Sequence, residues 1–130
     1  MSEIADFLRA RYAERQALAE AASPGPWHAN EEADEVVAVD GITVADGFAL
    51  SGRQLRATVQ HIAANDPTAV IAECDAKLAV IKLMDERPKY AEGDTEVDHY
   101  GALGMAEEAL RRLAQPFAGH PDHKGEEWAP

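Results

Sequence analysis

The chain has 130 residues, the length of one average domain, and 46% of them are hydrophobic, which supports a buried core and excludes wholesale disorder. The net charge of −12, from 24 acidic and 12 basic residues, argues against a general nucleic-acid binder, because affinity for phosphates depends on cationic side chains. Cys74 is the single cysteine, so an intramolecular disulfide and a four-cysteine zinc site are excluded. The first residues lack the apolar run of a secretory signal, and no run reaches the roughly 18 residues of a membrane span. We therefore expect a cytoplasmic protein.

Residues 2–22 are predicted to form the first helix, with Ser2 as its N-cap. Its apolar stripe consists of Ile4, Leu8, Tyr12 and Leu18 or Ala19. Three arginines, Arg9, Arg11 and Arg15, lie on the remaining surface, where we expect solvated side chains with i,i+4 pairing. An anion-binding patch is the alternative.

A rigid turn ends this helix at Ser23-Pro24-Gly25-Pro26. Pro24 disfavours helical geometry at the residue before it, and Pro-Gly suits the two central positions of a type II turn. Trp27 follows directly, and an indole fixed by such a turn is expected to anchor a core. Stacking on a ligand is the alternative.

Two β-branched segments, 36–39 and 42–45, flank Asp40-Gly41, which predicts a hairpin with a type I′ turn. An isolated hairpin is marginally stable in water. We therefore expect Trp27 and a helix face to cover it, or a third short strand around 26–29 to join it.

The second and third helices are predicted over 52–64 and 67–85. Ser51 has the spacing of a capping box with Gln54, while Asp66 and Pro67 suit the N-cap and first position of the third helix. The apolar stripe of that helix consists of Ile71, Cys74, Leu78 and Ile81. Cys74 is thus expected in the core, and its alternative role as a nucleophile finds no local histidine.

A polar connection over 87–95, a fourth helix over 96–114 and a C-terminal segment follow. Gly101 and Gly104 would let another backbone approach the fourth helix, so a homodimer seam is open there. We expect one domain of residues 1–119, with residues 120–130 docked on it through Trp128. The predicted fold class is α+β, a small single domain with four helices and one β-hairpin.

Several motifs resemble known families. The sequence Ala-Ala-Ser-Pro-Gly-Pro-Trp ending at Trp27, with His61–Ile71 further on, resembles Ead-type early proteins of temperate phages. Residues 46–56 (DGFALSGRQLR), together with residues 113–122 and the Glu-Glu-Trp ending at Trp128, resemble a widespread actinobacterial family carried as a domain of unknown function. This second resemblance covers nearly the whole chain. It implies an actinobacterial or phage origin and an accessory cytoplasmic role, and it supplies no catalytic residues.

Histidines and carboxylates gather near the C-terminus. His120, Asp122 and His123 are candidate ligands of a divalent metal, with Glu126 and Glu127, or Asp98 and His99, as further ligands. A turn at His120-Pro121-Asp122 is the alternative. There is no Gly-rich phosphate loop and no nucleophile elbow, so no catalytic residue is assigned and no cofactor is expected.

A protein-interaction module is the function that the sequence favours. Trp27, with Arg53 and Arg56 at the rim, would form a groove together with the hairpin and the second helix and would dock on a protein partner. In a second version, acidic side chains of the Lys- and Arg-free stretch 17–52 imitate a DNA backbone and inhibit a nucleic-acid enzyme. These acids are Glu31, Glu32, Asp34, Glu35, Asp40 and Asp46.

Overall fold

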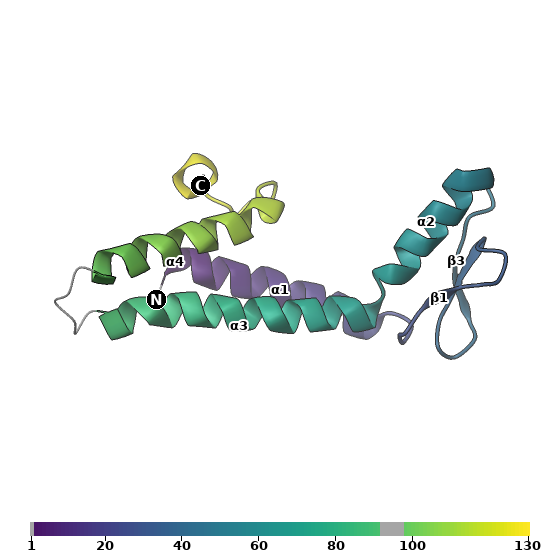
Figure 1. The fold of residues 1–130 in the computed structure, drawn as a ribbon, viewed down its shortest axis with the longest axis horizontal. Coiled ribbons are helices and arrows are strands. Elements are labelled where there is room, and N and C mark those ends of the chain that lie inside the picture. Colours follow the sequence, from purple (N-terminus) through teal and green to yellow (C-terminus); the bar gives the residue numbers. More distant parts are fainter. Residues whose placement is uncertain (1, 92–97) are drawn as a thin grey trace. The chain divides into compact units, whose positions relative to one another are not determined.

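The computed structural model describes residues 2–91 and 98–130, which contain four α-helices and a three-stranded antiparallel sheet (Figure 1). The α+β class predicted from the sequence is thereby confirmed. The elements are α1 (Glu3–Ala21), β1 (His28–Ala29), β2 (Glu35–Val37), β3 (Thr43–Asp46), α2 (Gly52–Ala64), α3 (Pro67–Ala91), α4 (Asp98–Ala114) and the short 3-10 helices η1 (Gln115–Phe117) and η2 (Gly125–Trp128). None of the helices in the described ranges is long and apolar enough to cross a bilayer.

The chain divides into two compact units. The terminal unit combines residues 1–14 with 75–130, and the central unit comprises residues 15–74. The predicted boundary between residues 1–119 and 120–130 stays a prediction.

The sheet of the central unit has the order β1-β2-β3, so the short strand expected around 26–29 is present. Val36 lies opposite Ala45, and Glu35 lies opposite Asp46. Val36 is fully buried and forms a core with Val59 and Ala63 of α2. Half-buried apolar residues pack around this core: Trp27, Ala29, Val44, Ala45, Leu55 and Ile62.

The hairpin is closed by a three-residue loop, and the predicted type I′ turn is wrong. The amide of Ala38 donates to the carbonyl of Ile42 at 2.9 Å, and the amide of Gly41 donates to the carbonyl of Ala38 at 2.9 Å. Gly41 has a positive φ of 84°, whereas Asp40 does not have one. The Asp40 carboxylate instead accepts a bond from the amide of Ile42 at 3.1 Å, a local arrangement typical of aspartate in turns.

The turn before Trp27 also differs from its prediction. A type II turn requires a positive φ at Gly25, but Gly25 is not among the residues with one, and the Gly25–Pro26 peptide bond is cis. The expected end of α1 in this region is nevertheless correct, since the helix stops at Ala21.

Helix α2 has the predicted bounds, and α1 begins with the predicted N-cap, because the Ser2 hydroxyl accepts a bond from the amide of Ala5 at 3.2 Å. The capping box of α2 is absent: Ser51 occupies the N-cap position, but its side chain makes no capping bond. Gly52 starts this helix with a φ of 55°, so the entry geometry differs from that of a capping box.

Helix α3 runs to Ala91 and passes through Arg87 and Pro88, so the predicted end at Asp85 is wrong. At the predicted end, the Asp85 carboxylate accepts bonds from Nη2 of Arg9 and from the amide of Ser2, so tertiary contacts hold this residue within the helix. Such contacts outweigh weak local signals for a helix end. The rest of the predicted polar connection, residues 92–95, lies outside the described residues, as do residues 96 and 97 at the predicted start of the fourth helix. Cys74 is buried in α3, as predicted.

In the terminal unit an aromatic cluster joins α1 to the C-terminal segment. The ring centroids of Phe7 and Trp128 are 5.1 Å apart, and those of Tyr12 and Phe117 are 5.3 Å apart. Trp128 is only 7% exposed. A Cβ added at Gly101 or Gly104 would meet no described atom within 4 Å, so these glycines serve no close packing in the part of the chain that the structure describes. A homodimer seam there stays a prediction.

Candidate functional site

A surface hollow of about 250 Å³ lies beside Trp27 in the central unit. The end of α1 and the start of α3 form its other walls. It is lined by Arg15, Leu18, Ala19, Ala22, Trp27, Asn65, Pro67 and Val70. Most of these side chains are apolar, so the hollow suits an apolar group of a ligand.

Two hydrogen bonds hold Trp27 at the edge of this hollow. Its indole Nε1 donates to the carbonyl of Ser23 at 2.9 Å, and its backbone amide donates to Oδ2 of Asp66 at 2.9 Å. Oδ1 of Asp66 accepts a bond from the amide of Ala69 at 2.8 Å and so caps α3, as the sequence predicts. One buried carboxylate therefore ties the tryptophan to the first turn of α3.

The turn itself packs tightly against α3. A Cβ added at Gly25 would collide with Oγ1 of Thr68 and would stand 3.2 Å from the Cβ and the backbone nitrogen of Thr68. Glycine is thus required here by close approach rather than by backbone conformation.

The rim of the hollow carries an exposed leucine and an arginine. Leu18 is 75% exposed, although the sequence stripe includes it as an alternative to Ala19. Arg15 is exposed and makes no hydrogen bond or ion pair with any residue that the structure describes. Tryptophan and arginine are enriched among the residues that dominate binding energy at protein interfaces, and the exposed Leu18 adds apolar surface beside them.

The structure brings Trp27 together with Arg15, not with the two arginines predicted to accompany it. Arg53 and Arg56 lie exposed on α2 and are not among the residues that line the hollow. A sequence signal for the observed lining exists in the helical spacing i, i+3, i+4 of α1. This spacing places Arg15, Leu18 and Ala19 on one face, and Ala22 follows directly after the helix end.

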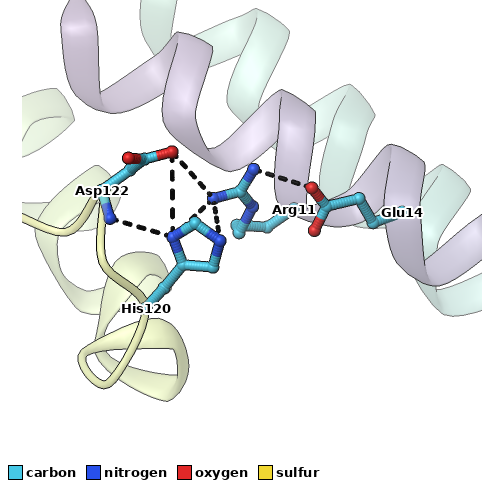
Figure 2. A network of polar contacts seen from close by, with 4 residues as sticks. All are labelled: Arg11, Glu14, His120 and Asp122. Atoms are coloured by element: carbon cyan, nitrogen blue, oxygen red, sulfur yellow. Dashed lines mark hydrogen bonds and ion pairs between the residues drawn. The ribbon is translucent and has the colours of Figure 1, made fainter.

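The predicted metal ligands lie in the terminal unit, where Figure 2 shows the guanidinium of Arg11 between Glu14 on one side and His120 and Asp122 on the other. Nη1 of Arg11 lies 2.7 Å from Nδ1 and 2.6 Å from Nε2 of His120. Nη2 donates to Oε1 of Glu14 at 2.8 Å, and Nη1 stands 3.7 Å from Oδ2 of Asp122. A cationic side chain thus occupies the neighbourhood of two predicted ligands.

The two histidines also stabilise turns. Nδ1 of His120 accepts a bond from the amide of Asp122 at 3.0 Å, and Nδ1 of His123 accepts one from the amide of Gly125 at 2.9 Å. The amide of His123 donates to the carbonyl of His120, as expected for the alternative turn. Among the described residues no group of three His, Cys, Asp or Glu is placed to hold a metal. The side chains of Asp98 and His99 lie outside the description.

Arg9 and Arg11 are not the solvated pair that the sequence predicts. Arg11 is 8% exposed, and its guanidinium lies 5.0 Å from the ring centroid of Phe7. Arg9 donates to Oδ2 of Asp85 at 2.9 Å and to Oδ1 of Asp6 at 3.1 Å. The hydrogen bond to Asp85 raises the pKa of Arg9. Of the three arginines on α1, only Arg15 matches the expected exposed position.

The fold and the hollow together define a small α+β protein with an apolar surface hollow edged by a tryptophan. The chain belongs to the family of unknown function DUF6221, whose model matches residues 1–130. This confirms the prediction of a family of unknown function that covers the chain. No curated protein and no solved structure matches it.

Proposed function

We propose that the protein is a small interaction module that binds a protein partner through the hollow beside Trp27. The observation that carries this proposal is the combination of an apolar hollow with an exposed leucine and an unpaired arginine on its rim. Leu18 is 75% exposed in the free protein. A partner that covers it removes apolar surface from water, which favours binding.

The rigid setting of Trp27 supports the same proposal. Its indole and its backbone amide are both hydrogen-bonded, so the ring is ordered before a partner arrives. A preorganised aromatic side chain loses little conformational entropy on binding, which favours affinity.

The test compares the same leucine-to-glutamate substitution at two positions, one on the rim of the hollow and one away from it. The full chain is immobilised and exposed to a nuclease-treated actinobacterial lysate at two salt concentrations, and bound proteins are identified by mass spectrometry. The Leu18→Glu variant places a charge on the rim and should lose a partner that the unchanged chain retains.

Leu83→Glu is the matched control, because Leu83 is 54% exposed on α3 in the terminal unit and should tolerate the same change. Circular dichroism confirms that both variants are folded. If the two variants capture the same proteins, or the unchanged chain captures none, the proposal is wrong.

One observation favours a second candidate, the acidic inhibitor of a nucleic-acid enzyme. Glu35 and Asp46 lie directly opposite each other on neighbouring strands, close in sequence to the exposed Glu31 and Glu32. No ion pair to a cation is found for these four acids within the described residues. Binding by these acids would weaken steeply with salt, whereas binding in the hollow would respond little.

The cellular context belongs to the same proposal. An actinobacterial or phage origin rests on the resemblance of the Pro-Gly-Pro-Trp turn, the 46–56 segment and the C-terminal motif to known families. A cytoplasmic location and an accessory role follow from that resemblance.

A further inference from the structure

We infer that the hollow beside Trp27 selects a partner segment in which an apolar side chain adjoins a carboxylate, and that Arg15 binds this carboxylate. The inference rests on the proposed function and specifies the chemistry of the partner. The apolar side chain would enter the hollow, and the carboxylate would lie at its rim.

The polar groups that line the hollow point to an anion. Arg15 is the single charged side chain in the lining. The indole N–H of Trp27 already donates to the carbonyl of Ser23, and Nδ2 of Asn65 donates one bond to the carbonyl of His61 at 2.8 Å. The cationic donor of the lining is the Arg15 guanidinium, which matches a carboxylate in geometry as well as in charge.

The three arginines of α1 differ in whether an acidic side chain of the protein pairs with them. Arg9 is bound to Asp6 and Asp85, and Arg11 is bound to Glu14. Arg15 has no such partner among the described residues, although nearly one residue in five of the whole chain is acidic. It thus remains able to pair with an incoming carboxylate.

The net charge of the protein excludes a trivial explanation for such selectivity. At −12, the whole molecule repels anions, so any preference for a carboxylate must arise from a local contact. A partner with the opposite chemistry, an apolar side chain beside a lysine, would be repelled by Arg15 and is disfavoured at this rim.

The experiment titrates the ¹⁵N-labelled full chain with three small probes and follows the two indole N–H signals by NMR. N-acetylleucine carries the apolar side chain and the carboxylate, N-acetylleucinamide lacks the charge, and N-acetylglycine lacks the side chain. The Trp128 signal, assigned with Trp128→Phe, is an internal control because that indole lies in the terminal unit. We expect the Trp27 signal to shift most with N-acetylleucine, which should bind about three- to tenfold more tightly than its amide.

The Arg15→Gln variant should bind the acid and the amide equally, while Arg15→Lys should keep part of the preference, because lysine offers charge without the planar pair of donors. Equal binding of both leucine probes to the unchanged chain would overturn the role of Arg15 and leave the hollow intact. If neither leucine probe moves the Trp27 signal, both the inference and the proposed hollow fail. A response to N-acetylglycine equal to that of N-acetylleucine would show anion binding without a role for the apolar side chain, and the inference would then be wrong.

Discussion

At the scale of single residues, Asp85 shows how a buried charge connects two helices. Its carboxylate accepts bonds from Nη2 of Arg9 at 2.9 Å and from the amide of Ser2 at 3.3 Å. Burial alone would raise the pKa of this carboxyl. The bonds from Arg9 and Ser2 together lower it by more than burial raises it, so the pKa lies below the usual 3.8. The ionised form is therefore stabilised by folding, and protonation must weaken the fold.

We predict that Asp85→Asn lowers the free energy of unfolding by about 1–3 kcal/mol near neutral pH, because Arg9 loses its charged partner. Since the pKa of Asp85 is lowered in the folded state, this contribution is present above the unfolded pKa of 3.8 and is lost as the pH falls through the folded value. Urea unfolding of both proteins over a pH series should show the difference narrowing below about pH 4. The exposed Glu32→Gln is the control and should have a small effect. A penalty that stays constant down to the lowest pH at which both proteins fold would contradict this account.

At the scale of elements, the close contact between the turn at Gly25 and the start of α3 sets one side of the hollow. We predict that Gly25→Ala lowers the free energy of unfolding by about 1–3 kcal/mol, because the new Cβ collides with the Thr68 side chain. Thr68→Ala removes the nearest atom, so the double variant should be less destabilised than the two single effects added together.

Gly101→Ala is a matched control with the opposite expected sign. Its added Cβ meets no described atom within 4 Å, and alanine is favoured over glycine inside a helix by about 1 kcal/mol. Urea unfolding of the four variants, followed by circular dichroism and by the combined fluorescence of Trp27 and Trp128, measures the coupling. Additive effects of Gly25→Ala and Thr68→Ala would mean that the two residues do not clash.

The elements that sequence predicts well are those with local signals. The bounds of α2 follow from helical periodicity, and the start of α3 follows from Asp66 and Pro67, a capping residue and a first-turn residue that are adjacent in sequence. The hairpin follows from the β-branched pattern, but the type I′ turn predicted for its loop is wrong. The Asp40 carboxylate accepts the bond from the amide of Ile42 in place of a backbone carbonyl.

The candidate site is only partly predictable, because it depends on contacts between residues that are far apart in sequence. Trp27 stands out in the sequence, but its bond to Asp66 joins residues 39 positions apart, and the contact of Arg11 with His120 joins residues 109 apart. No local pattern encodes such pairs, so the burial of Arg11 and the fixed position of Trp27 appear only in the folded chain. The grouping of Arg15 with Trp27 likewise depends on α1 meeting α3, which sequence spacing does not specify.

At the scale of the whole molecule, the net charge divides equally between the two units. The central unit has 9 acidic and 3 basic residues and the terminal unit has 15 and 9, so each carries a net charge of −6. The central unit also places Glu35 opposite Asp46 on neighbouring strands, where like charges destabilise a sheet. Self-repulsion should therefore limit the stability of the protein at low ionic strength, and the pair of Glu35 and Asp46 is one identifiable source of it.

We predict that sodium chloride raises the melting temperature, because salt of about 0.1 M screens charges beyond about 10 Å. Asp46→Asn should raise the melting temperature at low salt by about 1–5 °C, the equivalent of removing a like-charge pair worth roughly 0.2–1 kcal/mol, and should reduce the further gain from salt. Glu108→Gln is the matched control, since Glu108 pairs with Arg112 at 2.9 Å and its loss should lower stability slightly. Calorimetry of the three proteins at low and high salt separates the effects. A melting temperature that falls with salt would mean that attractive ion pairs outweigh repulsion, and an unchanged salt response in Asp46→Asn would place the repulsion elsewhere in the molecule.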